Sequence, residues 1–199
     1  MMQYLRSLQW VDYFFYVFVE PGRLTHLLEV ESWRHFMIGL FSIILVTVID
    51  IITGALLVPQ TGFFYYAVTY GWILQVVITL TGILVYAGLL DMVFQYYGFP
   101  GVVKKLVSIL SISLFPQVLL LPSVYIFKTF NFAPLFFNAL FSVVLTIWSL
   151  MIAVQCIAEL QKMDFFRALV LTLLPLVILG VIAFFVFLLI VFLLMGYVA

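Results

Sequence analysis

The sequence predicts an all-α polytopic membrane protein with five transmembrane helices and an N-terminal interfacial amphipathic helix. Of its 199 residues, 67% are hydrophobic and only 8% are charged, so polar groups cannot cover the surface and the chain must be dissolved in a bilayer. Five apolar segments are each long enough to cross about 30 Å of hydrocarbon as a helix. Near the N-terminus, polar residues repeat at spacings of three and four, which is typical of a helix that lies on a membrane surface.

Residues 1–35 are expected to form a cytoplasmic interfacial segment that precedes a five-helix transmembrane domain over residues 36–199. The first helix of this segment has a polar stripe, formed by Arg6, Gln9, Tyr13, Tyr16 and Glu20. The opposite face is apolar and comprises Leu5, Leu8, Val11, Phe15 and Phe18. Pro21-Gly22 is expected to end this helix, and a second short amphipathic turn around residues 24–31 leads into the first span.

The five spans are predicted at residues 36–58, 66–97, 103–127, 132–158 and 166–197. Residues 168–199 carry no charge, but two spans joined by a turn would need about 40 residues. We therefore predict a single long helix there, with a kink at Pro175.

Basic residues predict the orientation, because lysine and arginine are retained on the cytoplasmic side of a membrane. With five spans and the N-terminus inside, one basic residue, Lys128, lies outside. The cytoplasmic ones are Arg6, Arg23, Arg34, Lys104, Lys105, Lys162 and Arg167. We expect a multi-pass protein of the cell (inner) membrane with its C-terminus outside, whose loop cations Lys104, Lys105, Lys162 and Arg167 are candidate contacts for a partner.

Asp50 is the most anomalous residue, because it lies well inside the first span, where a carboxylate costs roughly 2.5–3.5 kcal/mol. Thr47, Thr53 and Gly54 lie three or four residues away on the same helix and are expected to receive it. Two interpretations remain open: a proton- or cation-linked functional site, and a hydrogen-bonded or protonated packing residue.

Two helical faces of small and hydrogen-bonding residues are expected to face each other or a shared interior. One lies in the second span (Gly71, Gln75, Thr79, Gly82, Tyr86) and one in the fourth (Asn138, Ser142, Thr146, Ser149). In lipid, such faces serve helix packing more often than a solute path. Asp91 and Gln75 are further candidate functional residues of the second span, although Asp91 lies near its cytoplasmic end, where a structural role is favoured.

The third span contains Pro116 and Pro122, with Gln117 beside the first. Proline removes a backbone donor and frees a carbonyl, so this helix is predicted to be kinked or broken near mid-membrane. Pro116 and Gln117 are therefore candidates for an intramembrane site, although a kink that only shapes packing is more frequent.

Signatures of catalysis, metal binding and cofactor binding are not found. His26 and His35 lie nine residues apart without a metal-binding spacing, and Cys156 is interpreted as a buried structural thiol. The net charge is zero, which excludes nucleic acid as a partner. The expected partners are the lipid bilayer and other membrane proteins, or a second copy of the chain.

The charged stretch from Glu159 to Arg167 is predicted to be a cytoplasmic hairpin between the last two spans. Glu159 and Lys162 are spaced for an i,i+3 pair, and Asp164 stands where the N-cap of the last helix belongs. Its charges are expected to mark a turn that reaches water.

From residue 83 onward, the order of features resembles the Yip family of multispanning membrane proteins. The stretch "LLDMVFQYYGFPGVVKKLVSILSISLFPQ" is similar to that family's junction of the second and third spans. "LTIWSLMIAVQCIAELQKMDFFRALVLTLLP" is similar to its fourth-to-fifth hairpin, with Trp148, Arg167-Ala168 and Pro175, and Pro21 matches a proline before the first span. The resemblance implies five spans and a cytoplasmic N-terminus. The long N-terminal region of eukaryotic members, with its Asp-Leu-x-Gly-Pro motif, has no counterpart, so their Rab binding is not carried over.

Two functional hypotheses follow. The first is a non-enzymatic membrane protein of the Yip type, similar to the short prokaryotic members, that organises or shapes its membrane and partner proteins. The alternative is a small ion or solute transporter or channel in which Asp50 is the intramembrane site.

Overall fold

The computed structural model describes residues 9–27, 33–57, 70–131 and 133–198. Within these ranges the chain is helical and contains no strand, which confirms the predicted all-α class. The elements are α2 (Gln9–Val19), α3 (Arg23–Leu27), α4 (Trp33–Leu57), α6 (Trp72–Tyr96), α7 (Val103–Ser113), the 3₁₀ helix η2 (Phe115–Leu119), α8 (Leu120–Thr129), α9 (Pro134–Gln161) and α10 (Phe165–Val198).

Five helical segments of the described chain are long and apolar enough to cross a membrane. They are His35–Leu57, Trp72–Tyr96, Val103–Thr129, Pro134–Gln161 and Phe165–Phe192. The number of spans and their approximate bounds agree with the prediction. The expected end of the first span at residue 58 and the expected start of the second at residues 66–69 lie outside the described residues.

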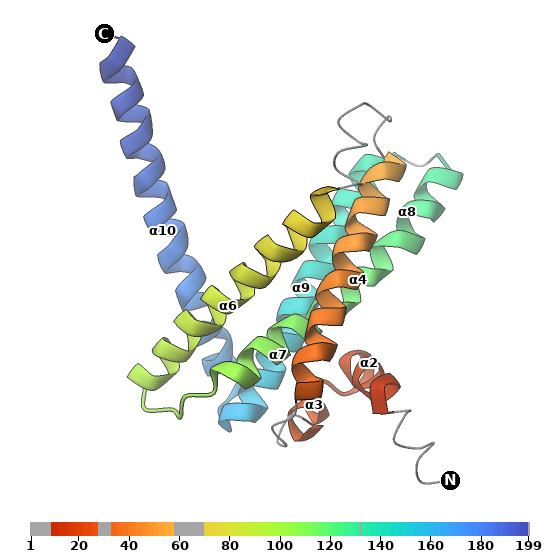
Figure 1. The fold of residues 1–199 in the computed structure, drawn as a ribbon, viewed down its shortest axis with the longest axis vertical. Coiled ribbons are helices and arrows are strands. Elements are labelled where there is room, and N and C mark those ends of the chain that lie inside the picture. The colour runs from red at the N-terminus through yellow and green to blue at the C-terminus, as the bar shows by residue number, and fades with distance from the viewer. Residues whose placement is uncertain (1–8, 28–32, 58–69, 132, 199) are drawn as a thin grey trace.

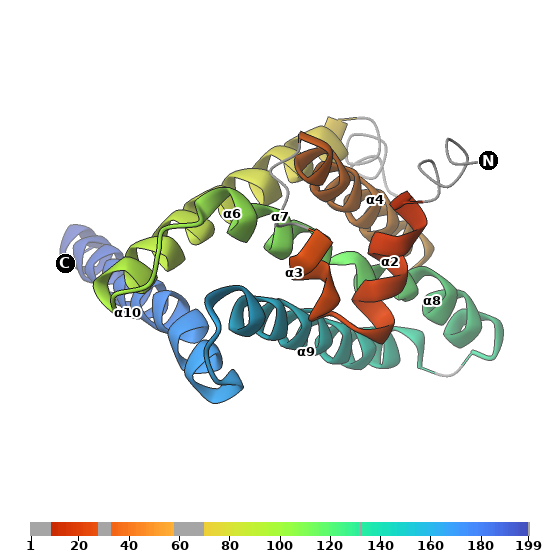
Figure 2. The same cartoon turned by 90° about the horizontal axis from the view of Figure 1, so that it is seen from below.

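The third span lies in the centre of the bundle, with its α7 part surrounded by α4, α6 and α9 (Figures 1 and 2). Small side chains make this possible. A Cβ added at Gly39 of α4 would lie only 2.9 Å from the Cβ of Ser111 of α7, so the two helices touch where both residues are small. Every residue of α7 from Leu106 to Ser113 is buried.

The third span is broken at Pro116, as predicted. α7 ends at Ser113, the 3₁₀ helix η2 contains Pro116 and Gln117, and α8 continues to Thr129. Proline cannot donate a backbone hydrogen bond to the preceding turn, so the change to 3₁₀ geometry has a local cause. The break places Gln117 at the middle of the span.

The N-terminal segment packs directly on the five-helix domain. Figure 2 shows α2 and α3 across one end of the bundle, between α4 and α9. The predicted stripe is wrong at Tyr13, which is buried together with Val17, whereas Phe15 of the apolar face is exposed. The reason is tertiary, because Phe14 stacks on Phe115 of η2 at 4.2 Å between ring centroids and this turns the Tyr13 face of α2 inward. Arg6, Leu5 and Leu8 lie outside the described residues.

The link between α2 and α3 is also fastened to the bundle. α2 ends at Val19 and Pro21-Gly22 follows, as predicted. The buried Cys156 donates its thiol hydrogen to the Pro21 carbonyl at 3.1 Å. α3 covers the start of the second turn that the sequence predicted, and residues 28–31 of that turn lie outside the described residues.

α10 is one continuous helix with Pro175 inside it, so the prediction of a single long last span is confirmed. Its first two turns pack against α6 and α9, where Ala168, Leu171 and Thr172 are buried. Its C-terminal part leans away from α6, so that the molecule is broader at the end where α10 finishes (Figure 1).

Candidate functional site

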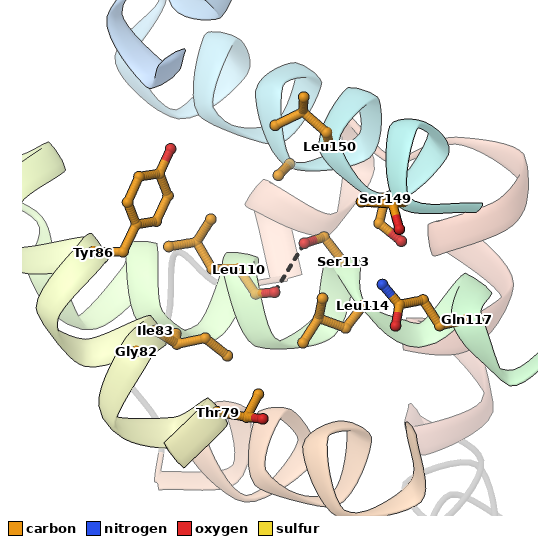
Figure 3. Close-up of a pocket in the computed structure, with 12 residues that line it drawn as sticks. Thr79, Gly82, Ile83, Tyr86, Leu110, Ser113, Leu114, Gln117, Ser149 and Leu150 are labelled. Atoms are coloured by element: carbon orange, nitrogen blue, oxygen red, sulfur yellow. Dashed lines mark hydrogen bonds between the residues drawn. The ribbon is translucent and has the colours of Figure 1, made fainter. Parts of the chain in front are cut away.

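A cavity of about 350 Å³ lies between α6, α7, η2 and α9 (Figure 3). Its polar lining residues come from all four elements and are Thr79, Tyr86, Ser113, Gln117, Thr146 and Ser149. The rest of the wall is apolar or small and comprises Gly82, Ile83, Leu110, Leu114, Leu150 and Ala153. The lining therefore combines a mostly apolar surface with a few neutral hydrogen-bonding groups, which is the usual composition of a small-molecule site.

Three of the six polar groups are already used in holding helices. Ser113 donates to the Leu110 carbonyl at 2.9 Å, and Thr146 donates to the Ser142 carbonyl at 2.8 Å. The phenol of Tyr86 donates to the carbonyl of Thr172 at 2.5 Å and so joins α6 to α10. These bonds leave little donor capacity at the three hydroxyls.

The other three polar groups, Thr79, Gln117 and Ser149, have no hydrogen-bond partner within the described part of the chain. Ser149 is only 4% exposed, and its hydroxyl oxygen is buried. Figure 3 shows the Gln117 amide turned toward the α9 turn that carries Ser149. An unpaired buried polar group costs roughly 1–3 kcal/mol, so the buried Ser149 hydroxyl is unexplained by the fold alone, whereas Thr79 and Gln117 are partly exposed.

The cavity confirms that parts of the two predicted polar faces share an interior. Thr79, Gly82 and Tyr86 of the second span lie across from Thr146 and Ser149 of the fourth. The earlier members of both faces, Gly71, Gln75, Asn138 and Ser142, do not line it. Ser113 was missed from the sequence, although it lies four residues before Gln117 and hence on the same helical face.

Asp50 does not line the cavity. It is exposed, and its carboxylate accepts a hydrogen bond of 2.7 Å from the amide of Gln75 in α6. The expectation that Thr47 and Thr53 receive this carboxylate is wrong, because both threonines are buried and the partner comes from the neighbouring helix. The pair joins the first and second spans.

Asp91 holds the loop between α6 and α7. It is buried, and its two carboxylate oxygens accept hydrogen bonds of 2.6 Å from the backbone N–H of Val102 and the amide of Gln95. Gly101 allows this approach, since a Cβ there would lie 2.7 Å from the Gln95 amide nitrogen. The arrangement matches the structural interpretation that the sequence favoured for Asp91.

The loop cations lie at the same end of the molecule as α2 and α3 (Figure 1). Lys104, Lys162 and Arg167 are exposed, whereas Lys105 is half-buried. The guanidinium of Arg167 lies 5.1 Å from the centroid of the Phe99 ring. Lys128 lies at the opposite end, where it donates to the Leu56 carbonyl at 2.8 Å.

The hairpin between α9 and α10 has the predicted N-cap but not the predicted ion pair. Asp164 accepts a hydrogen bond of 3.1 Å from the backbone N–H of Phe166. The ion pair found in the described chain joins Arg23 and Glu20 at 2.8 Å. Glu159 instead lies against Gly22, while Lys162 takes the left-handed conformation that ends α9.

The described residues contain no group of three or more His, Cys, Asp and Glu side chains that could hold a metal ion. His35 is hydrogen-bonded to the Tyr13 phenol at 2.8 Å. A scan against protein-family models, a search of curated proteins and a search of solved structures find no match.

Proposed function

We propose that this chain is a non-enzymatic integral membrane protein of the Yip type, which organises or shapes its membrane and the proteins in it. The observation that carries the proposal is the second half of α10. From Leu176 to Phe192 every residue except Val191 is exposed, and the segment contains no hydrogen-bonding side chain. A helix that leaves its own bundle makes its contacts with lipid or with neighbouring membrane proteins.

The outline of the molecule supports the same proposal. Because the C-terminal part of α10 leans away from α6, the bundle is wider at one end than at the other (Figure 1). An inclusion with unequal widths in the two leaflets favours a curved bilayer, since the lipids have to pack against its sloping sides.

Potentially reactive side chains are engaged in contacts that hold the fold. The Cys156 thiol fastens the link between α2 and α3, His35 is bonded to Tyr13, and Asp91 fastens the loop before α7. This use of the thiol, imidazole and carboxylate supports a structural rather than a catalytic protein.

For the topology we propose a cell-membrane protein with the α2 end in the cytoplasm and the end of α10 outside. Five basic side chains at the α2 end support this proposal, namely Arg23, Lys104, Lys105, Lys162 and Arg167, against Lys128 at the other end. Single cysteines introduced at Lys105 and at Lys128 should be labelled by a membrane-impermeant maleimide from opposite sides of oriented vesicles.

The proposal is tested with purified protein in giant vesicles from which thin tubes are pulled. Fluorescently labelled protein should be enriched in the tube relative to the flat membrane, and liposomes containing it should show no saturable uptake of ions or metabolites. A length-matched variant with polyleucine from Leu176 to Phe192 distinguishes shape from recognition. The polyleucine variant should stay enriched in the tube if contact with lipid is sufficient. It should lose this enrichment if particular side chains of α10 bind neighbouring molecules. Robust saturable uptake of an ion or metabolite by liposomes with the unmodified protein would contradict the proposal.

The geometry favours the transporter alternative less. Asp50 and Gln75 bind each other at an exposed position, and neither lines the cavity. The intramembrane carboxylate is therefore not connected to the space in which a solute would be held.

A further inference from the structure

We infer that the cavity between α6 and α9 is a binding site for an uncharged lipid whose polar end carries hydroxyl or carbonyl oxygens. The inference goes beyond the proposed function and does not depend on it. It begins from three unpaired groups, the Thr79 hydroxyl, the Gln117 amide and the Ser149 hydroxyl, which three different elements bring to one cavity.

These groups specify the ligand's polar end. Each of them can donate a hydrogen bond, and the Gln117 amide can donate two. The complement is a group with several acceptor oxygens close together, such as an ester or a glycerol end. Thr79 and Gln117 are partly exposed and open to the ligand, whereas the Ser149 hydroxyl oxygen is enclosed by protein and meets the ligand once its side chain turns toward the cavity.

The charge and depth of the site exclude an ionic headgroup. The residues that line the cavity include no Asp, Glu, Lys or Arg, and burying an unpaired charge is far more costly than burying a neutral polar group. Gln117 and Ser149 also lie near the middle of their spans. A phospholipid headgroup stays at the interface, whereas an uncharged lipid can carry its polar end to that depth.

The walls and the size fit the apolar part of such a lipid. Ile83, Leu110, Leu114 and Leu150 face the space, and about 350 Å³ is within the range of small-molecule sites. α10 meets the cavity at the Tyr86–Thr172 hydrogen bond and then leans away (Figure 1). An acyl chain can therefore extend from the cavity into the bilayer beside α10.

The experiment uses the full chain in phosphatidylcholine vesicles with a trace of diacylglycerol that carries a diazirine in one acyl chain next to the ester. Irradiation should label lining residues of α6, α7 or α9, and unlabelled diacylglycerol should abolish the labelling whereas added phosphatidylglycerol should not. Gln117→Leu and Ser149→Ala should each reduce it about two- to tenfold, as expected for one lost hydrogen bond.

A matched pair of glycine variants separates occupancy from folding. A Cβ at Gly82 or at Gly180 meets no atom within 4 Å, so both positions have room for a larger side chain, but only Gly82 lines the cavity. Gly82→Phe should abolish labelling of the cavity while Gly180→Phe leaves it unchanged, with protection of Cys156 from a thiol dye as the check on folding. Labelling that persists in folded Gly82→Phe, or that phosphatidylglycerol displaces equally well, would overturn the inference and indicate bulk lipid or water in the cavity. Either result is independent of tube enrichment, which tests the proposed function.

Discussion

The third span and α10 are both apolar helices of one chain, yet one is largely buried within the bundle and the other is largely exposed. In the most apolar window of each, 61% of the residues of the third span are buried, against 6% for α10. The buried helix is the more polar one, with Ser108, Ser111 and Ser113 all facing inward. Inside a bilayer, hydrophobicity does not drive a helix to the centre, because lipid tails are equally apolar. Small side chains place a helix at the centre instead, because they allow neighbouring helices to approach closely.

The serines of α7 illustrate why such a helix can be buried. Ser108, Ser111 and Ser113 donate to the carbonyls of Lys104, Val107 and Leu110, respectively. Their hydroxyls are therefore satisfied within α7 itself, and the helix presents short side chains to its neighbours without unpaired donors. From Leu176 to Phe192, α10 offers large apolar side chains except at Gly180 and Ala183, and lipid is an adequate partner for such a surface.

The largest expected effect comes from disturbing the close contact at the centre. Gly39→Leu should separate α4 from α7, because a Cβ at Gly39 already lies 2.9 Å from Ser111, and overpacking costs about 1–3 kcal/mol. Thermal unfolding in detergent can be followed by the reactivity of Cys156, which is buried and is the single cysteine of the chain. In this variant, Cys156 should become reactive at a lower temperature than in the unmodified protein.

Gly180→Leu on α10 is the matched control for this comparison. A Cβ at Gly180 meets no atom within 4 Å, so the substitution should leave the midpoint temperature of unfolding, followed by Cys156 reactivity, unchanged. An equal loss of stability in the two variants would show that α10 is packed as tightly as the third span.

Asp91→Ala should rank next, because it leaves the backbone N–H of Val102 without its acceptor at a cost of about 1–3 kcal/mol. Hydrogen exchange in nanodiscs should accelerate in the loop 97–102 that leads into the third span. Asp50→Ala removes a carboxylate at an exposed position and should leave that loop protected. Unchanged exchange in Asp91→Ala would contradict the assigned role.

Asp164→Ala should have a smaller and more local effect. The loss of this N-cap, which accepts from the N–H of Phe166, costs typically about 1 kcal/mol. Exchange should accelerate in the first turn of α10 and not in the third span, and Asp164→Ser should restore the protection. Faster exchange across the whole bundle would mean that α10 stabilises the centre more than its burial suggests.

Arg167→Gln should have the smallest effect. It removes the contact between the guanidinium and the Phe99 ring, which is worth about 0.5–1 kcal/mol at an exposed site. The midpoint of Cys156 labelling should fall slightly, and Arg167→Lys should retain part of the interaction. Lys162→Gln is the control, since Lys162 has no ring contact among the described residues. A larger shift for Lys162→Gln than for Arg167→Gln would argue against the contact with Phe99.

Features with local causes could be predicted from the sequence. The spans follow from the length of each apolar run, the break of the third span follows from Pro116, and the start of α10 follows from the capping chemistry of Asp164. For the candidate site, the hydrogen-bonding faces of the second and fourth spans were predicted and Gln117 was named. Each of these depends on residues within a few turns of one another.

Features that depend on which helices meet could not be predicted in the same way. Tyr13 was assigned to a polar stripe because its spacing allowed it, but the contact of Phe14 with Phe115 turns it inward. Asp50 was expected to bond within its own helix, and its partner is Gln75 of the next span. The i,i+3 pair of Glu159 and Lys162 was wrong, because Gly22 from the N-terminal link occupies the side of Glu159.

The sequence by itself determined that this protein crosses a membrane five times, since the cost of placing polar backbone and charge in lipid is a local and additive property. The tertiary structure decided which helix became the centre, which polar groups were left unpaired around a cavity, and where α10 leaves the bundle. Helix packing in lipid depends on the mutual fit of surfaces far apart in the chain, and no periodicity within one segment contains that information.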